Sequence, residues 1–157
     1  MNHRFLARFC GLAFPVLIVA LVPLLLARAD EPVPMTRLAP SDIDALQKPG
    51  AGVKMTPVLG DSTKPGLYSV RVTIPAHTRT PVHTHRDNRA VTVISGTLRV
   101  GYGTTYDPKA LKELPPGSFY TEPASQPHYT ETQDEPVLII VTGWGPSDTK
   151  LVTNPTP

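Results

Sequence analysis

Short segments in which apolar and polar residues alternate recur along the chain after residue 52. In the clearest of them, residues 68–74, every second side chain is Tyr, Val or Ile and the others are Ser, Arg or Thr. A period of two is that of a strand with one buried face. Short strands at regular spacing, with little helix, predict an all-β antiparallel sandwich or barrel. The strands are expected at residues 54–59, 67–74, 83–85, 90–95, 97–102, 118–122, 128–132 and 137–144.

Two of the chain's five histidines, His83 and His85, lie two residues apart in one of these extended segments. Alternate side chains of a strand leave on the same face, so both imidazoles can reach one metal ion, whereas Thr84 points the other way. A third histidine, His128, opens another predicted strand. Three neutral imidazoles are the ligand count of an open metal site, in which positions remain for water or substrate.

The connections between the strands carry signals of their own. Residues 86–89 are interpreted as a polar hairpin loop, and Gly96 is expected to supply a tight reversal between two strands. Residues 107–113 begin with Asp and Pro, the cap and first position of a helix, and predict one short surface helix. The apolar side chains expected in the core or the pocket wall are Val91, Val93, Val100, Leu138, Ile140 and Trp144.

The order of these features resembles the two motifs of the cupin superfamily. In both, a His-x-His pair, a short loop and an apolar strand ending on Gly are followed by a Pro-Gly turn, a further Pro (Pro123) and a last histidine, here His128. The resemblance covers about residues 55–144 and is to the small, single-domain, type-2-like members. It implies a double-stranded β-helix, or jelly-roll, barrel that binds one divalent metal ion inside through His83, His85 and His128.

Two positions depart from the family pattern. His77 stands where the family has a Gly, and Arg89 stands where a Glu normally joins the metal. Some cupins, such as the thiol and diketone dioxygenases, work with three histidines alone, so the departure does not remove the site. An inward Arg89 would favour an anion, which could be a carboxylate or enolate substrate or a bound phosphate. An outward Arg89 would be a solvated charge paired with Asp87, since burying an unpaired arginine is costly.

Three further side chains are candidates for substrate chemistry. Tyr120 and Glu122 share one face of the predicted strand 118–122. If that face lines the pocket, Glu122 replaces the absent carboxylate as a metal ligand or acts as a general base, and Tyr120 donates a hydrogen bond. Otherwise the pair lies at the rim or the surface. His77 follows a turn and is expected at the surface or the pocket rim, where it can position substrate.

The first 29 residues differ in kind from the rest. A basic start, an apolar run over residues 11–26 and a small-x-small ending are typical of a secretory signal peptide cleaved before Asp30. An uncleaved membrane anchor is the alternative. Cleavage predicts a periplasmic or secreted protein without stable membrane association. A Pro-rich lead-in (30–52), the barrel (53–146) and a C-terminal tail (147–157) complete the expected organisation.

Removing this segment changes the charge and the thiol content. Three of the 15 basic residues leave and no acidic residue does, so 12 basic residues face 13 acidic ones at a net charge of −1. That balance gives no reason to expect nucleic acid as a partner. The single cysteine, Cys10, leaves as well, which excludes a disulfide and a cysteine-type zinc site in the mature chain.

Together these features predict an exported metal-binding protein. The resemblance implies dioxygenase or lyase chemistry on a small, and with an inward Arg89 anionic, organic molecule. The ion stays open among zinc, iron, copper, manganese and nickel, because affinity and availability both decide it. Oligomeric state is open too, with a homodimer paired through the outer sheets as one expectation. The alternatives are a non-catalytic module that binds or senses a metal or small ligand, and a metal-free barrel whose histidines contact ligand directly, as in cupins similar to the sugar epimerases.

Overall fold

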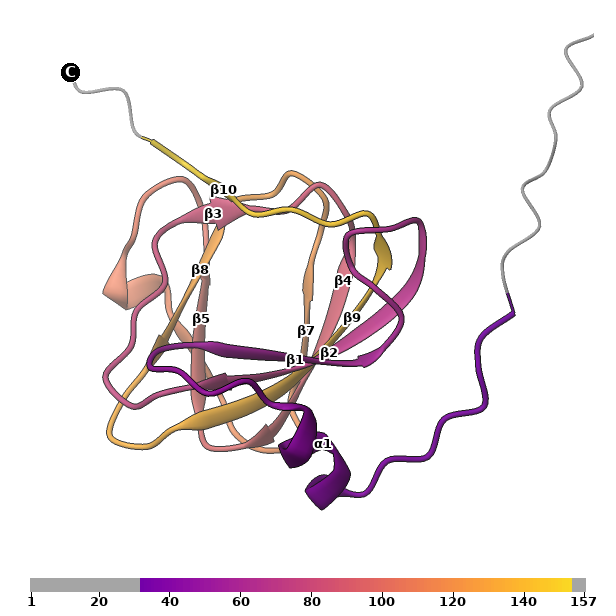
Figure 1. Cartoon of the computed structure of the whole chain (residues 1–157). Helices are drawn as coiled ribbons and strands as arrows, with labels where there is room; N and C mark the ends of the chain where they lie inside the picture. The colour runs from indigo at the N-terminus through magenta and orange to yellow at the C-terminus, as the bar shows by residue number, and fades with distance from the viewer. Residues whose placement is uncertain (1–31, 154–157) are drawn as a thin grey trace, which may run out of the picture.

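The computed structural model describes residues 32–153, and the predicted signal peptide lies outside this range. Two five-stranded antiparallel sheets face each other across a shared interior (Figure 1). The first sheet has the order β1-β2-β9-β4-β7 and the second β10-β3-β8-β5-β6, so the predicted all-β jelly-roll barrel is confirmed. The elements are α1 (Pro40–Leu46), β1 (Lys54–Leu59), β2 (Gly66–Ile74), β3 (His83–Thr84), β4 (Arg89–Ser95), β5 (Leu98–Tyr102), the 3-10 helix η1 (Pro108–Ala110), β6 (Lys112–Leu114), β7 (Phe119–Glu122), β8 (His128–Thr132), β9 (Val137–Gly145) and β10 (Lys150–Leu151).

The core follows the alternation of the strands. In β2 the side chains of Tyr68, Val70, Val72 and Ile74 are all buried, as their spacing predicts. They pack on buried residues of both sheets: Val91, Val93, Leu98, Val100, Leu114, Tyr120, Val137, Ile139 and Val141. The interior is therefore lined by one face of each sheet.

Strand β9 departs from the predicted core. Its sequence is apolar on both faces, so alternation alone does not say which face turns inward. The structure buries Val137, Ile139 and Val141 and places the other set outside. The prediction that Leu138, Ile140 and Trp144 belong to the core or pocket wall is wrong, and Trp144 is half exposed.

The expected hairpins around residues 86–89 and Gly96 do not form. Strand β3 pairs with β8 and β10 in the second sheet, whereas β4 pairs with β7 and β9 in the first. Residues 86–89 therefore cross from one sheet to the other, and Gly96, with φ at 72°, turns the chain back across. The turn signals located the changes of direction but not the sheet that each next strand joins.

The surface helix predicted over residues 107–113 is reduced to η1. The Asp107 carboxylate accepts a 2.9 Å hydrogen bond from the Lys109 N–H, as expected for a cap. The chain then forms β6, in which Leu114 is the cross-strand partner of Leu98 and is buried. Burying this leucine in the sheet outweighs the local preference for helix.

The α-helix of the described residues lies instead in the Pro-rich lead-in, next to β1 and β2 (Figure 1). Its Asp44 carboxylate accepts a 2.6 Å hydrogen bond from Arg71 of β2, and the Gln47 side chain accepts another at 3.3 Å. Arg71 faces away from the interior, yet these contacts leave it only 7% exposed. Within residues 32–153, no helix is long and apolar enough to cross a membrane.

The C-terminal segment returns across one end of the barrel. Strand β10 pairs with β3, with Leu151 opposite His83, so the sheet extends beyond residue 146 into the expected tail. The segment after β9 thus borders the histidine pair, which places it beside the candidate site.

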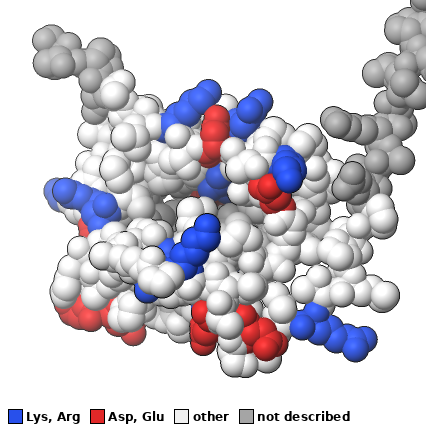
Figure 2. All heavy atoms as spheres, viewed as in Figure 1, with Lys and Arg blue, Asp and Glu red and all other residues white. Residues whose placement is uncertain are grey.

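On the face shown in Figure 2, basic and acidic side chains are interspersed without a large patch of one sign.

Candidate metal centre

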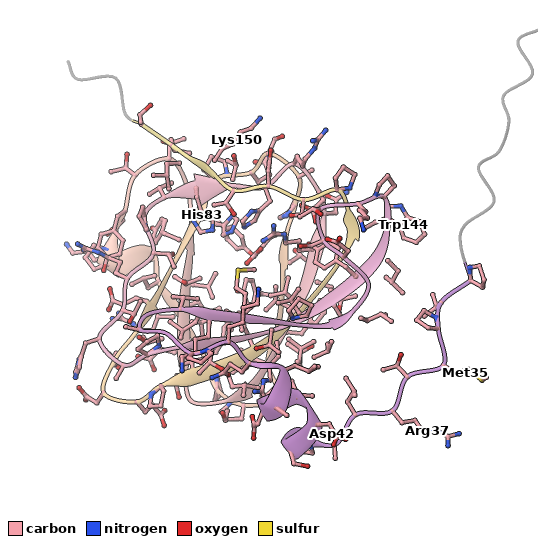
Figure 3. The ribbon with its side chains drawn as sticks, in the orientation of Figure 1. Met35, Arg37, Asp42, His83, Trp144 and Lys150 are labelled. Carbon is pink, nitrogen blue, oxygen red and sulfur yellow. The ribbon has the colours of Figure 1, made fainter. Side chains whose placement is uncertain are left out.

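The structure brings His83, His85 and His128 together inside the barrel. His83 of β3 and His128 of β8 are direct cross-strand partners, and His85 follows β3 by one residue. One ring nitrogen from each histidine lies within 4.8 Å of the other two. Nitrogens bound to a common ion at about 2.1 Å lie up to about 4.2 Å apart, so a small closing movement suffices. Figure 3 shows His83 on the inner side of the barrel, below the strand that carries Lys150.

Backbone carbonyls fix the orientation of all three rings. The Nδ1 atom of His83 lies 2.8 Å from the Pro81 carbonyl oxygen, that of His85 2.6 Å from the carbonyl of residue 148, and that of His128 3.1 Å from the carbonyl of residue 126. A carbonyl only accepts, so each Nδ1 carries the proton and donates it. Each Nε2 is then left with its lone pair, the state in which histidine binds metal.

The Glu122 carboxylate faces these free nitrogens. Its Oε2 lies 3.3 Å from Nε2 of His85, and its Oε1 lies 3.6 Å from Nε2 of His128. Glu122 and His128 are 5% and 1% exposed, and both Oε2 of Glu122 and Nε2 of His128 are buried without a hydrogen-bond partner. Unpartnered buried polar atoms are costly and rare. A divalent ion among these atoms would satisfy all of them, so the residues fit a site with three nitrogen ligands and one oxygen ligand.

The Arg89 side chain points inward and lines the pocket, which is the first of its two predicted orientations. It is a direct cross-strand partner of Glu122, and its Nη1 lies 3.5 Å from Oε2 of that carboxylate. The place of the usual glutamate is thus taken by an arginine, while a carboxylate stands opposite on β7. Arg89 is not the unpaired buried cation considered from the sequence, because Asp87 faces it as well, with Oδ2 at 3.4 Å from Nε.

Asp87 is held by a buried network beside the arginine. Its carboxylate accepts hydrogen bonds from the Tyr68 hydroxyl at 2.6 Å and from the Ser147 hydroxyl at 2.7 Å. Arg89 in turn donates to the Ser147 hydroxyl and to the carbonyl of Asp148 at 3.2 Å. That same carbonyl accepts from His85. One C-terminal residue therefore positions both a candidate ligand and the charge beside it.

Burial sets the protonation of the site. It lowers the pKa of His85 from 6.5 to about 4 and also lowers the pKa of His83, which keeps both imidazoles neutral at neutral pH. Burial, together with the charge of Glu122, raises the pKa of Tyr120 well above its usual value. Tyr120 is therefore a hydrogen-bond donor, and its hydroxyl lies 3.2 Å from Oε1 of Glu122. Tyr120 and Glu122 are the buried side chains of β7 and face the interior, which is the first of the two placements predicted for them.

The candidate ligands open into a cavity of about 140 Å³. His83, His85, Arg89 and Glu122 line its polar part, and Thr130 and Tyr120 lie beside them. Apart from Thr80 and Thr149, the rest of its wall is apolar and comes from the first sheet and the residues just before it: Val53, Met55, Val72, Ile74, Ile139 and Val141. A cavity with convergent polar groups at one end and apolar walls elsewhere is typical of small-molecule sites.

The comparison with known families agrees with this geometry. A family model described as "Cupin domain" matches residues 70–143, which include all three histidines, Arg89 and Glu122. The chain belongs to the cupin superfamily. No curated protein matches the sequence.

Solved structures of other cupin-fold proteins are similar at low identity. A structure of DMSP lyases shares 18% identity at a TM-score of 0.55, covering 64% of this chain and 53% of that one. The polyketide cyclase RemF from Streptomyces resistomycificus shares 15% at 0.61, covering 77% and 87%. An RmlC-like cupin from Shewanella frigidimarina shares 19% at 0.50, covering 62% and 80%. The chain thus spans about half of the lyase structure, and at these identities the shared feature is the fold.

His77 does not join the centre of this cupin. Its N–H donates to the carbonyl of Gln133, just past the end of β8, whereas His128 begins that strand. The four residue steps of β8 alone separate these ends by roughly 13 Å. The His77 ring is largely exposed near Asp134 and lines a separate open hollow of about 460 Å³. Its position gives no support to a role in binding substrate at the histidine cluster.

Gly143 leaves the space that the buried network occupies. A Cβ on this residue would lie 2.6 Å from the Tyr68 hydroxyl oxygen and 2.9 Å from Oδ2 of Asp87. We expect Gly143→Ala to destabilise the protein by about 1–3 kcal/mol through overpacking, and to weaken metal binding by displacing Asp87. Denaturant unfolding and zinc titration measure the two effects. Thr142→Ala, whose side chain lies on the opposite face of β9, is the control and should leave zinc affinity unchanged.

Several residues of the centre were not predicted as site residues from the sequence. Tyr68 was predicted only as part of a buried face, and Asp87 only as a partner for an outward Arg89. Gly143, Ser147 and Asp148 had no role. A glycine inside an apolar strand is the one available signal, because it often marks a close approach of other groups.

Proposed function

We propose that the protein is an exported, metal-dependent cupin enzyme that acts on a small organic molecule. The observation that carries the proposal is the set of His Nε2 atoms and the unpartnered Oε2 of Glu122 at the end of an apolar cavity. Such a donor set suits first-row divalent ions, so zinc, iron, copper, manganese and nickel are the candidates. When bound, the ion would supply Lewis-acid chemistry or, for iron and copper, oxygen chemistry.

The chain's own residues would bind and orient the substrate. Glu122 would complete the ligand set, which makes it unavailable as a general base in that state. Tyr120, kept protonated by burial, would hold Glu122 through its hydroxyl. The aliphatic walls would exclude water and hold the apolar part of the substrate.

The cavity limits the size and charge of that substrate. Its volume of about 140 Å³ is close to that of a cavity which admits benzene, about 150 Å³. Arg89 lies between Asp87 and Glu122, so its charge is already offset and it is no free anion site. The charges of Asp87, Glu122 and Arg89 sum to −1, so a bound divalent ion would bring the net charge of the site to +1. We infer that the part of the substrate held inside the cavity has about six to eight non-hydrogen atoms, with one negatively charged head group and an apolar body.

Metal content and reactivity test the proposed function. Purified protein is loaded with zinc, iron or copper, and bound metal is measured after desalting; we expect close to one equivalent, and less than about a tenth rejects the metal site. The iron- and copper-loaded forms are then given short diketones, thiols and carboxylates while oxygen and product are followed. Oxygen uptake indicates a dioxygenase, and product without oxygen uptake a lyase. Flavonoids, which exceed the cavity, serve as the size control.

Two outcomes would change the proposal. Tight binding of a small ligand with no turnover, for any loaded metal, would favour the non-catalytic binding or sensing module. Binding of the ligand without metal would favour a barrel whose histidines contact ligand directly. Either result leaves the geometry of the pocket intact and reassigns its use.

Export and assembly belong to the same proposal. A signal peptide ending at residue 29 would place the mature chain in the periplasm or outside the cell, and amino-terminal sequencing of protein from each cell fraction tests this. Ile94 and Phe119 are exposed on the first sheet, which supports a homodimer through its outer face. Light scattering of the mature protein measures the mass directly.

A further inference from the structure

We propose that Asp87 is a positioning residue that keeps Glu122 available to the metal by holding the guanidinium of Arg89. The inference rests on the metal site of the proposed function. Asp87 itself makes no hydrogen bond to a candidate metal ligand; its partners are Tyr68, Arg89 and Ser147. Its basis is a competition between two carboxylates for one buried arginine.

The competition arises from a row of residues across the inner face of the first sheet. Tyr68 of β2, Gly143 of β9, Arg89 of β4 and Glu122 of β7 are successive cross-strand partners. Neighbouring strands lie about 4.8 Å apart, so the row places Arg89 directly between Glu122 and the space above Gly143. Because glycine has no side chain, that space is filled by the Tyr68 hydroxyl and the Asp87 carboxylate. Arg89 thus has one carboxylate on each side.

The observed contacts of Arg89 favour the Asp87 side. Its Nε donates to Asp87, and its Nη2 donates to the Ser147 hydroxyl and the Asp148 carbonyl. The two direct distances barely differ: Nε lies 3.4 Å from Oδ2 of Asp87 and Nη1 lies 3.5 Å from Oε2 of Glu122, and both exceed the 2.7–3.2 Å of an ordinary N–H···O hydrogen bond. The two hydrogen bonds of Nη2 therefore hold the guanidinium on the Asp87 side. Oε2 of Glu122 consequently has no hydrogen-bond donor and remains free.

Asp87 is itself fixed from two directions. Tyr68 and Ser147 donate to its two oxygens at 2.6 and 2.7 Å, and the aspartate is only 7% exposed. The two hydroxyl donors and the Arg89 guanidinium all face this carboxylate, which suits its anionic form. If the charge of Asp87 were removed, the nearest carboxylate for Arg89 would be that of Glu122. The guanidinium could then donate two parallel hydrogen bonds to the Glu122 carboxylate. That pairing would compete with the metal for the same oxygens.

A double-mutant cycle tests the inference on the full chain, with zinc affinity measured by chelator competition. We expect Asp87→Asn to weaken zinc binding by about 10- to 100-fold, as loss of an outer partner does. Glu122→Gln should weaken binding about tenfold or more in the wild type but less than about threefold in the Asp87→Asn background, since the arginine has already withdrawn Glu122. The visible spectrum of the cobalt-loaded protein should change with Glu122→Gln only when Asp87 is present.

Rescue separates positioning from the simple loss of a negative charge. In the Asp87→Asn background, Arg89→Met should restore both the affinity and its dependence on Glu122, because no cation remains to capture the carboxylate. If the effects of Asp87→Asn and Glu122→Gln are additive, Asp87 acts only through its charge and the inference is overturned. If wild-type protein binds no zinc, the proposed function fails first.

A second variant covers the case in which Asp87→Asn does not fold, as judged by circular dichroism. Tyr68→Phe removes the 2.6 Å hydrogen bond to Asp87 and keeps every charge. We expect it to weaken zinc binding less than Asp87→Asn and to reduce the effect of Glu122→Gln in proportion. An unchanged effect of Glu122→Gln in this folded variant contradicts the inference.

Discussion

Replacing His128 with alanine should reduce zinc affinity by more than about a hundredfold, a larger loss than outer-shell changes cause. The residue is the most enclosed of the three histidines, and its unpartnered Nε2 points at the shared position in the barrel. Loss of this ring removes the ligand that β8 supplies. The remaining candidate ligands are His83 and His85, which lie two residues apart, and Glu122. Isothermal titration or chelator competition measures the change.

Matched variants make this result interpretable. His77→Ala removes a histidine that is largely exposed and lies in a separate hollow, so zinc affinity should not change. His83→Ala removes a half-buried member of the cluster and should weaken zinc binding with a smaller cost in stability than His128→Ala. Equal affinities for wild type and a folded His128→Ala variant would mean that the imidazoles do not share an ion.

The histidine cluster could be predicted because its signal is short in range and simple in geometry. The spacing of an extended chain was enough to predict that His83 and His85 share a face. Predicting His128 as the third ligand also required the order of the family's motifs. Tyr120 and Glu122 were assigned a common face correctly, since alternation in β7 separates them from Phe119 and Thr121. The face itself could not be chosen, because both sets contain an aromatic and a polar residue.

The partners of Arg89 could not be predicted from the sequence. Glu122 lies opposite it only through the register of β4 on β7, and Asp87 reaches it across Gly143 from a crossing segment between the two sheets. Interpreting residues 86–89 as a hairpin loop kept Asp87 at the surface. The error in connectivity and the error in the environment of Asp87 therefore have the same origin, which is that local turn signals carry no information on sheet membership.

Metal-free protein should lose stability as the pH falls from about 6.5 to about 4. Burial lowers the pKa of His85 from 6.5 to about 4 and also lowers that of His83. Between these values the unfolded chain binds more protons than the folded protein, so the free energy of unfolding decreases as the pH decreases. For His85, which is 4% exposed, the shift corresponds to a loss on the order of 3 kcal/mol once the pH is below both values.

Urea unfolding of the metal-free protein at steps from pH 7 to pH 4.5 measures this dependence. Keeping the pH above 4.5 excludes Asp87, whose pKa is lowered and whose contribution to stability is lost only under more acidic conditions. His85→Asn should flatten the profile, because asparagine has no proton to take up on unfolding. An equally steep decline in the wild type and in His85→Asn would contradict this prediction. It would mean that the His85 imidazole is not neutral and buried beside the Asp148 carbonyl, and its Nε2 would then not be established as a free metal ligand.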